Sequence, residues 1–265
     1  MMRKFAFLLV TAIAATFQGC GPLANLPLSD LSLPTAQLPP LPSQPKLSQE
    51  EAGSGLKEAL IKGVGTGTQK LQQTGGFSQN ALYKILLPPE IQSLESKIRG
   101  NSLLNAAIGK ELDKAIAAMN QGAEMATAKA MPIFKNAVQQ MSFRDALNIL
   151  TGGNGAATQY LKSNTTTELT AAFQPEIKTA LETVSIYQYW TPIVNTINRN
   201  KKVLGITQDV QPNLESYVTE KTLFALFTEI ETQENLIRKD PVQRSSDLLK
   251  RVFDYADNKQ NSSNP

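Results

Sequence analysis

Cys20 is the only cysteine among the 265 residues, and its surroundings suggest what its thiol is for. A positive start with Arg3 and Lys4 precedes an apolar run over residues 5–17, and Gly19 stands directly before the cysteine. This order of a charged, an apolar and a small-residue part is typical of a secretory signal peptide. The run is shorter than the roughly 20 residues that a membrane-spanning helix needs. We therefore expect residues 1–19 to be removed and Cys20 to become the new N-terminus.

A signal that ends in Gly-Cys resembles a bacterial lipobox, in which Leu, a small residue and then Gly or Ala precede the cysteine. Phe17 and Gln18 depart from the first two of these positions. The pattern predicts that Cys20 carries acyl chains such as palmitate, and two or more chains hold a protein stably on a membrane. Gly21, rather than Asp, follows the cysteine, which favours the outer membrane in a bacterium with two membranes. The alternative is an ordinary secreted protein with a free thiol, which is a liability in an oxidising compartment.

Other residue types limit the catalytic chemistry. The chain has no histidine, the usual general base near neutral pH and the commonest metal ligand. Ser-His-Asp and Cys-His machinery and the usual zinc sites are therefore excluded, and we expect no metal and no cofactor. Ser54 and Lys57 have the spacing of a Ser-x-x-Lys nucleophile, but no companion motif accompanies them. Catalysis is not expected, and a hydrolase that uses Ser-Lys or carboxylates remains the second alternative.

Five polar residues in otherwise apolar helical stretches form the candidate binding site: Asn120, Glu124, Arg238, Arg244 and Asp247. Asn120 and Glu124 are four residues apart, so they share one helix face. A buried pair between Glu124 and an arginine would be a charge-assisted contact. Such a pair could belong to a polar pocket for a small ligand, or it could only fix the register of the helices. Arg244 to Asp247 also fits a plain helix start, with a hydroxyl cap and an acid in the first turn.

The charge of the chain argues against a nucleic-acid partner. The net charge is +3, and it falls to +1 without residues 1–19, because Arg3 and Lys4 are their only charged residues. Proteins that bind nucleic acid usually carry a basic patch or stripe. The expected partners are a membrane, through the N-terminal lipid, and an envelope protein or an apolar ligand.

Proline and polar residues mark the ends of the folded region. Residues 20–47 carry the lipidation cysteine and a linker with seven prolines, which prevent a persistent helix or central strand. We expect a semi-extended tether, whose leucines lie on the folded domain or dock on a partner. Residues 257–265 are polar and are expected to be a disordered tail. Residues 48–256 remain for a single domain.

Helical periodicity dominates residues 48–256, and the short run YKILLP is the best candidate for a strand. The fold class is therefore expected to be all-α, a bundle-like domain of many helices behind the signal peptide and the tether. Ser48 with Glu51, and Ser142 with Asp145, are expected to cap helices. The expected helices start near 48, 89, 102, 142, 154, 165, 187, 219 and 240, the eighth at Thr219 and the last capped by Asp240.

Two stripes of small residues suggest how the helices pack. Ala59, Gly63 and Gly67 recur every four residues in the first helix, and a second stripe runs over residues 118–130. The glycine-rich stretch GVGTG lies in the first stripe, but no strand precedes it, as a phosphate-binding loop would require. We expect the two helices that carry these stripes to pack against each other.

Several motifs, in order along the chain, resemble one bacterial family. They are LKEAL at 56–60, MNQGAE at 119–124, PIFKNAVQQMSFRDALNILTGG at 132–153, AATQYL at 156–161, YVTEKTLFALF at 217–227 and IRKDPVQRSSDLLKRVF at 237–253. Together they are similar to the domain of unknown function 4197 (DUF4197) family, over roughly residues 56–253. The resemblance implies a secreted protein, often with a signal or lipoprotein leader, and supplies no chemistry because the family has no agreed activity. The pair Gln121-Gly122 and the long proline-rich leader depart from its usual pattern.

The sequence thus favours a lipid-anchored protein of the cell envelope that acts as a binding or scaffold module without catalysis. A carrier of an apolar or lipid ligand, held in a cavity between helices, is the first alternative. A cavity lined by Leu and Phe with one polar entry would support the carrier, whereas a deep cleft with Ser54 and Lys57 would support the hydrolase.

Overall fold

Two capping boxes open helices in the computed structural model, as the sequence predicts. Helix α1 (Gln49–Gln72) begins after Ser48, whose hydroxyl accepts the Glu51 N–H at 3.1 Å while the Glu51 carboxylate accepts the Ser48 N–H at 3.0 Å. Helix α5 (Phe143–Thr151) begins in the same way with Ser142 and Asp145. Each box satisfies two backbone donors that have no partner inside the helix.

The structure describes residues 47–183, 185–210 and 213–262. The predicted signal peptide, the lipidation site Cys20 and almost all of the proline-rich linker lie outside these residues. Within them every regular element is a helix, which confirms the all-α fold class. The other helices are α2 (Pro89–Gly100), α3 (Ser102–Thr127), α4 (Ala130–Gln140), α6 (Ala156–Thr183), α7 (Ile186–Arg199), α8 (Lys201–Leu204), α9 (Leu214–Lys239), the 3₁₀ helix η1 (Pro241–Gln243) and α10 (Asp247–Ser262).

Several helix boundaries differ from the sequence-based expectation, and α4 and α8 have no counterpart among the expected helices. The two helices expected to start near 154 and 165 are one continuous helix, α6, and Pro175 lies inside it without ending it. Helix α9 begins five residues before Thr219, because Asn213 accepts the Ser216 N–H at 2.9 Å and acts as the N-cap. Asp240 caps only the short η1, and α10 starts separately and extends to Ser262, past the expected boundary at 256.

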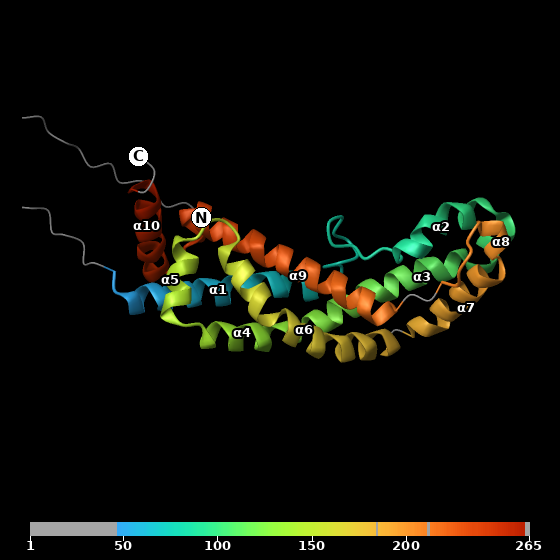
Figure 1. Ribbon diagram of the computed structural model, residues 1–265, viewed down its shortest axis with the longest axis horizontal. Helices are drawn as coiled ribbons and strands as arrows, with labels where there is room; N and C mark the ends of the chain where they lie inside the picture. The colour runs from blue at the N-terminus through green and yellow to red at the C-terminus, as the bar shows by residue number, and fades with distance from the viewer. Residues whose placement is uncertain (1–46, 184, 211–212, 263–265) are drawn as a thin grey trace, which may run out of the picture. The chain divides into compact units, whose positions relative to one another are not determined.

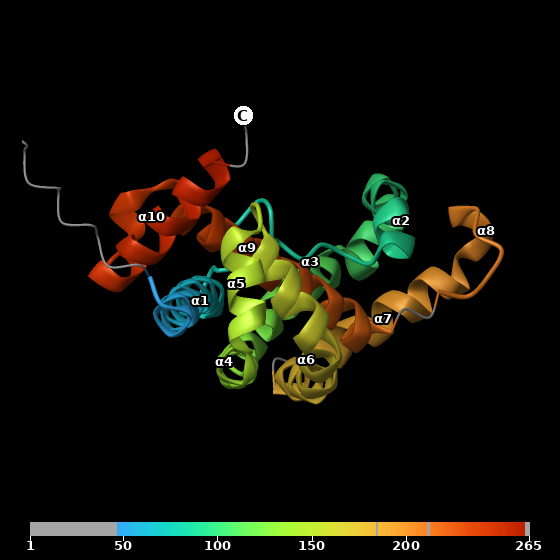
Figure 2. The same cartoon turned by 60° about the vertical axis from the view of Figure 1, so that its left-hand side comes forward.

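Helices α1, α3, α6 and α9 form the centre of the fold (Figure 1). Helix α9 packs against α6, α1 and α3, and α3 in turn packs against α1, α7, α6 and α2. Helices α4 and α5 both contact α1 and α6. Helix α10 packs on α1 and α5, as the turned view also shows (Figure 2). None of the described helices is both long and apolar enough to cross a membrane.

Helices α1 and α3, which carry the two small-residue stripes, do contact each other as predicted, but the glycines of the stripes face other helices. A Cβ atom on Gly67 would lie 3.3 Å from Glu229 Cγ, and one on Gly63 would lie 3.6 Å from Gln233 Cβ, so the first stripe faces α9. A Cβ on Gly122 would lie 3.0 Å from Leu181 of α6. The small residues do permit close helix approach, but periodicity within one helix does not tell which partner uses it.

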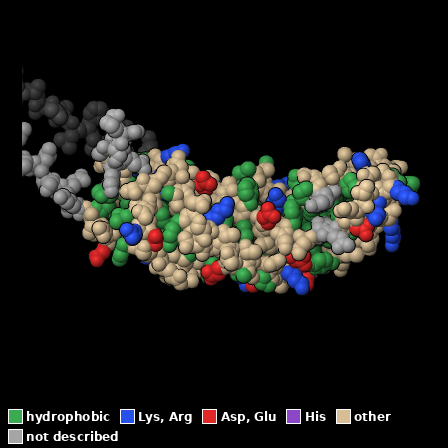
Figure 3. Space-filling model, in the orientation of Figure 1, with side chains coloured by type: hydrophobic (Ala, Val, Ile, Leu, Met, Phe, Trp, Pro, Cys, Tyr) green, Lys and Arg blue, Asp and Glu red, His purple; other side chains and the backbone are tan. Residues whose placement is uncertain are grey.

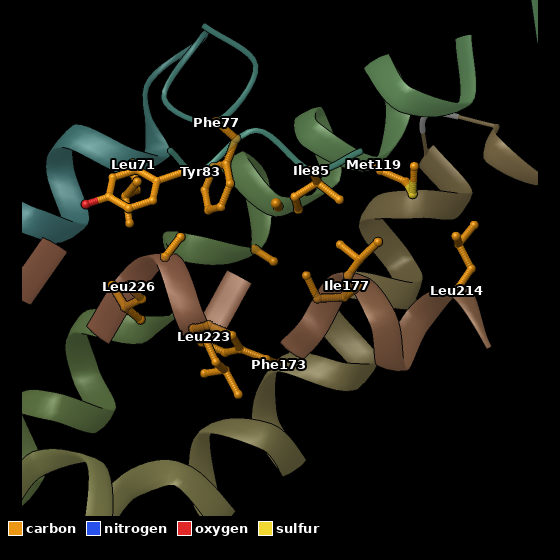
Figure 4. Close-up of a cluster of buried hydrophobic side chains, with 14 of the residues drawn as sticks. Leu71, Phe77, Tyr83, Ile85, Met119, Phe173, Ile177, Leu214, Leu223 and Leu226 are labelled. Atoms are coloured by element: carbon orange, nitrogen blue, oxygen red, sulfur yellow. The ribbon is translucent and has the colours of Figure 1, made fainter. Parts of the chain in front are cut away.

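The buried apolar side chains form one large cluster and one small cluster. The large cluster takes side chains from α1 through α9 and from the non-helical segment between α1 and α2. Figure 4 shows Phe77, Tyr83 and Ile85 of that segment pointing into the cluster beside Leu71. The small cluster joins α1, α5, the end of α9 and α10. The segment between α1 and α2 is therefore part of the core as well as a connection.

Candidate functional site

Residues 73–88, called the α1–α2 loop below, form the longest connection without regular structure in the described residues. Loops of this length inside a compact domain are uncommon and are usually functional. Figure 1 shows the loop as the teal segment that projects between α1 and α2. The polar residues that the sequence singled out on α3 both contact it.

Glu124 holds the first part of the α1–α2 loop. Its side chain is buried on α3, and its Oε1 accepts the backbone N–H groups of Gly75, Phe77 and Ser78 at 3.1, 3.2 and 3.4 Å. Gly75 has a φ of +90°, a left-handed conformation that favours glycine and helps to direct these N–H groups toward one point. The predicted pair between Glu124 and an arginine is not formed, because the carboxylate is occupied by backbone donors.

Asn120 holds the second part of the loop. Its side chain is fully buried one turn from Glu124, its Oδ1 accepts the Ile85 N–H at 2.9 Å, and its Nδ2 donates to the Ile85 carbonyl at 2.7 Å. The amide thus satisfies both backbone groups of one extended residue, as a neighbouring strand would. The sequence identified this residue but not its partner.

Tyr83 and Glu229 form a third contact, which the sequence analysis did not identify as a site. The Tyr83 hydroxyl donates to Glu229 Oε2 at 3.0 Å, and the same carboxylate pairs with Lys70 at 2.9 Å. Burial of Tyr83 and its hydrogen bond to Glu229 raise the pKa of the Tyr83 hydroxyl to about 12. A glutamate inside the apolar stretch LFALFTEI was the signal that could have indicated this contact.

A fourth polar contact fixes the end of the loop. The Tyr217 hydroxyl of α9 lies 3.0 Å from the Leu86 carbonyl and 3.2 Å from the Leu87 carbonyl, within hydrogen-bonding distance of both. With these contacts, burial alternates along residues 82–87: Tyr83, Ile85 and Leu87 face the core, while the other three residues face solvent. The loop therefore has a defined inner and outer edge.

The two predicted arginines lie in a different part of the fold, at the junction of α5, α6, α9 and α10. Arg238 pairs with Glu234 at 2.8 Å and donates to the Ile149 carbonyl at 2.8 Å and the Gly152 carbonyl at 3.1 Å. Glu234 also accepts the Ala157 N–H at 2.9 Å. The guanidinium thus neutralises the C-terminal end of α5, and the carboxylate caps the start of α6.

Arg244 joins α9 to α10. Only 3% of its surface is exposed, and it donates to the Arg238 carbonyl at 2.8 Å and to Asp254 and Asp257 at 2.9 Å each. Asp247 takes no part in this cluster, because its side chain is 96% exposed and pairs with Lys250. The five predicted residues therefore fall into a loop-holding pair, an arginine junction and one exposed carboxylate.

Ser54 and Lys57, the pair considered as a nucleophile and its base, are not joined by a hydrogen bond in the described part of the chain. Lys57 donates instead to the Gln139 carbonyl at 3.0 Å. The described residues contain no group of three or more His, Cys, Asp or Glu side chains that could hold a metal ion.

A groove of about 810 Å³ lies between α6 and α9. One wall carries residues spaced by four along α6, and the floor and opposite wall come from α9, with Leu223, Phe227 and the 56% exposed Phe224. The α6 wall is formed by Thr158, Lys162, Thr166, Thr170 and Gln174. At 1.5 Å per residue this wall is about 24 Å long. A threonine-bearing wall and apolar α9 side chains thus line one open channel. The hydroxyl groups of Thr158, Thr166 and Thr170 already donate to Glu234, the Lys162 carbonyl and the Thr166 carbonyl, respectively.

Together these features define a helical domain with an ordered loop and an open groove. The chain belongs to the family described as Protein of unknown function (DUF4197), which it matches over residues 46–254. No curated protein and no solved structure matches the chain. The family resemblance noted from the sequence is thus confirmed, and its assignment leaves the activity to be inferred from the structure.

Proposed function

We propose that this protein is a lipid-anchored component of the cell envelope whose helical domain binds a segment of another envelope protein in the α6–α9 groove. The observation that carries the proposal is the groove itself, because it is long, open and combines an apolar floor with hydroxyl-bearing walls. Amphipathic helices commonly bind in such grooves, with apolar anchors on the floor and polar groups at the rim. A 24 Å wall would accommodate about 16 helical residues.

The groove walls have the chemistry for such a ligand. Leu223 and Phe227 provide a floor that is already almost fully buried, and exposed Phe224 would lose water on contact. Lys162 on one wall and Glu220 and Glu231 on the other give a rim with both charges. On the face shown in Figure 3, charged side chains of both signs are likewise interspersed, so no strong field of one sign opposes a neutral partner.

An enclosed apolar ligand has less support. The void between α1, α9 and α10 is lined by Leu56, Val64 and Phe253 among others, but its volume is about 20 Å³. This is room for about one water molecule and not for an acyl chain. The α6–α9 groove is larger, but an apolar ligand in it would stay in contact with water.

Site-specific photo-crosslinking tests the groove. A photoreactive amino acid at Thr170, in the groove wall, should give a discrete crosslinked protein in intact cells. The matched control is Thr179, an exposed threonine on the same helix outside the groove lining. Identical products from both positions, or none from Thr170, would refute binding in the groove.

The lipid anchor is tested separately. Mass spectrometry of membrane-extracted protein should find an acylated N-terminal Cys20, and Cys20→Ser should leave an unacylated chain. An intact segment 1–19 or an unmodified thiol in the membrane fraction would refute the anchor and leave the groove proposal untouched.

A further inference from the structure

The α1–α2 loop carries two exposed leucines on an edge whose conformation is fixed from the inside. Leu82 is 63% exposed and Leu86 is 43% exposed, and exposed Lys84 stands between them. We infer that this edge contacts the surface of an anionic lipid bilayer, as an attachment additional to the lipid proposed for Cys20. The inference does not depend on a ligand in the α6–α9 groove.

The fixed conformation is the first argument. Glu124, Asn120, Glu229 and Tyr217 all direct buried or partly buried polar groups at this loop. Burying polar groups is unfavourable unless their hydrogen bonds are made, so these contacts favour one loop conformation over others. Because its inner edge is held at Tyr83, the loop cannot turn Leu82 inward without breaking these bonds.

The chemistry of the outer edge is the second argument. Apolar side chains next to lysine suit the boundary between head groups and acyl chains, where the leucine enters and the ammonium stays at the phosphates. The sequence between Glu58 and Glu90 contains three lysines and no acidic residue, so no carboxylate of the loop itself would repel an anionic surface.

Neighbouring helices add positive charge. Lys221 lies 5.7 Å from the centre of the Tyr217 ring, and the hydroxyl of that tyrosine holds Leu86. Lys70 is half exposed beside the Tyr83 contact, although Glu229 offsets its charge. Each lysine close to an anionic membrane contributes about 1 kcal/mol, or roughly a fivefold gain in binding. The charge on and around the loop therefore complements anionic lipid.

The test uses the mature chain from residue 20 with Cys20→Ser, so that no acyl chain contributes. Flotation with vesicles of phosphatidylglycerol and phosphatidylethanolamine should recover bound protein, and vesicles of phosphatidylcholine alone should recover less. The double variant Leu82→Ser/Leu86→Ser should bind at least about tenfold more weakly. The reason is that the exposed parts of the two leucines together equal the area of about one leucine side chain. Lys84→Gln should weaken binding only to the anionic vesicles, roughly fivefold.

Leu103→Ser is the matched control, because Leu103 is 81% exposed on α3, and it should bind like the parent. Circular dichroism and thermal melting of each variant show whether the domain is still folded. The inference is overturned if the parent does not bind anionic vesicles, if the double variant binds as well as the parent, or if Leu103→Ser loses as much. Self-association in sedimentation that the double variant abolishes, without vesicle binding, would identify a second copy as the partner instead. Photo-crosslinking from Thr170 tests binding in the α6–α9 groove independently of the result of these vesicle experiments.

Discussion

Replacement of Glu124 tests whether the α1–α2 loop is held by one buried carboxylate. Glu124→Ala would leave the N–H groups of Gly75 and Phe77, both in buried residues, without their acceptor, while Ser78 is exposed and its bond is long at 3.4 Å. A hydrogen bond to a charged group contributes about 1.5–3 kcal/mol. Two such bonds predict a loss of about 3–6 kcal/mol in the free energy of unfolding. Glu124→Gln keeps an oxygen acceptor without the charge and should lose about half as much.

Guanidinium unfolding of the mature Cys20→Ser chain, followed by circular dichroism, measures this loss. Glu168→Ala removes an exposed glutamate from α6 and should stay within about 0.5 kcal/mol of the parent. If Glu124→Ala stays within about 1 kcal/mol of the parent, the carboxylate does not fix the loop and the reasoning is wrong.

Three further substitutions give predictions of the same kind. Gly75→Ala should destabilise the chain by about 1–2 kcal/mol in guanidinium unfolding, because φ at this position is +90° and alanine is strained there; an unchanged midpoint would contradict this. The pKa of Tyr83 is raised by burial and by Glu229 to about 12, so the native state holds a proton that the unfolded state loses above pH 10. Between pH 10 and 12, the free energy of unfolding should therefore fall by at most about 2.7 kcal/mol more in the parent than in Tyr83→Phe. Parallel curves of this free energy against pH for the two proteins would exclude the linkage. Arg244→Met should lower thermal stability by about 2–3 kcal/mol, since the two backbone carbonyls that it binds near the end of α9 lose their donor; no shift in melting temperature would show that the junction is not needed.

Local sequence signals predicted the helices well. The capping boxes at Ser48 and Ser142 depend only on residues three positions apart, so the sequence contains all the information they need. The predicted start of α9, at Thr219, lies too late in the chain. The reason is that a lone N-cap residue, Asn213, is a weaker sequence signal than a capping box. Pro175 lies inside α6, and the structure keeps this helix continuous through it.

The candidate site could be predicted only in part. Asn120 and Glu124 were recognised as polar residues on an apolar helix face, but their partners are backbone groups, and any residue type provides those. The pairing of Glu124 with an arginine was therefore a reasonable expectation from side-chain charges and was still wrong. The stripes of small residues correctly paired α1 with α3, but they did not reveal that the stripe glycines face α9 and α6, because a stripe does not identify the helix that approaches it.

The small apolar cluster of α1, α5, the end of α9 and α10 is separate from the large one, and this affects how the domain opens. Undocking of helix α10 would disrupt mainly the small cluster, so such partial opening costs less free energy than global unfolding. Amide protons of α10 should then exchange with solvent earlier than those of α3, and equal protection would contradict this. Among the described helices, α10 would thus become accessible to a protease before the helices of the large cluster.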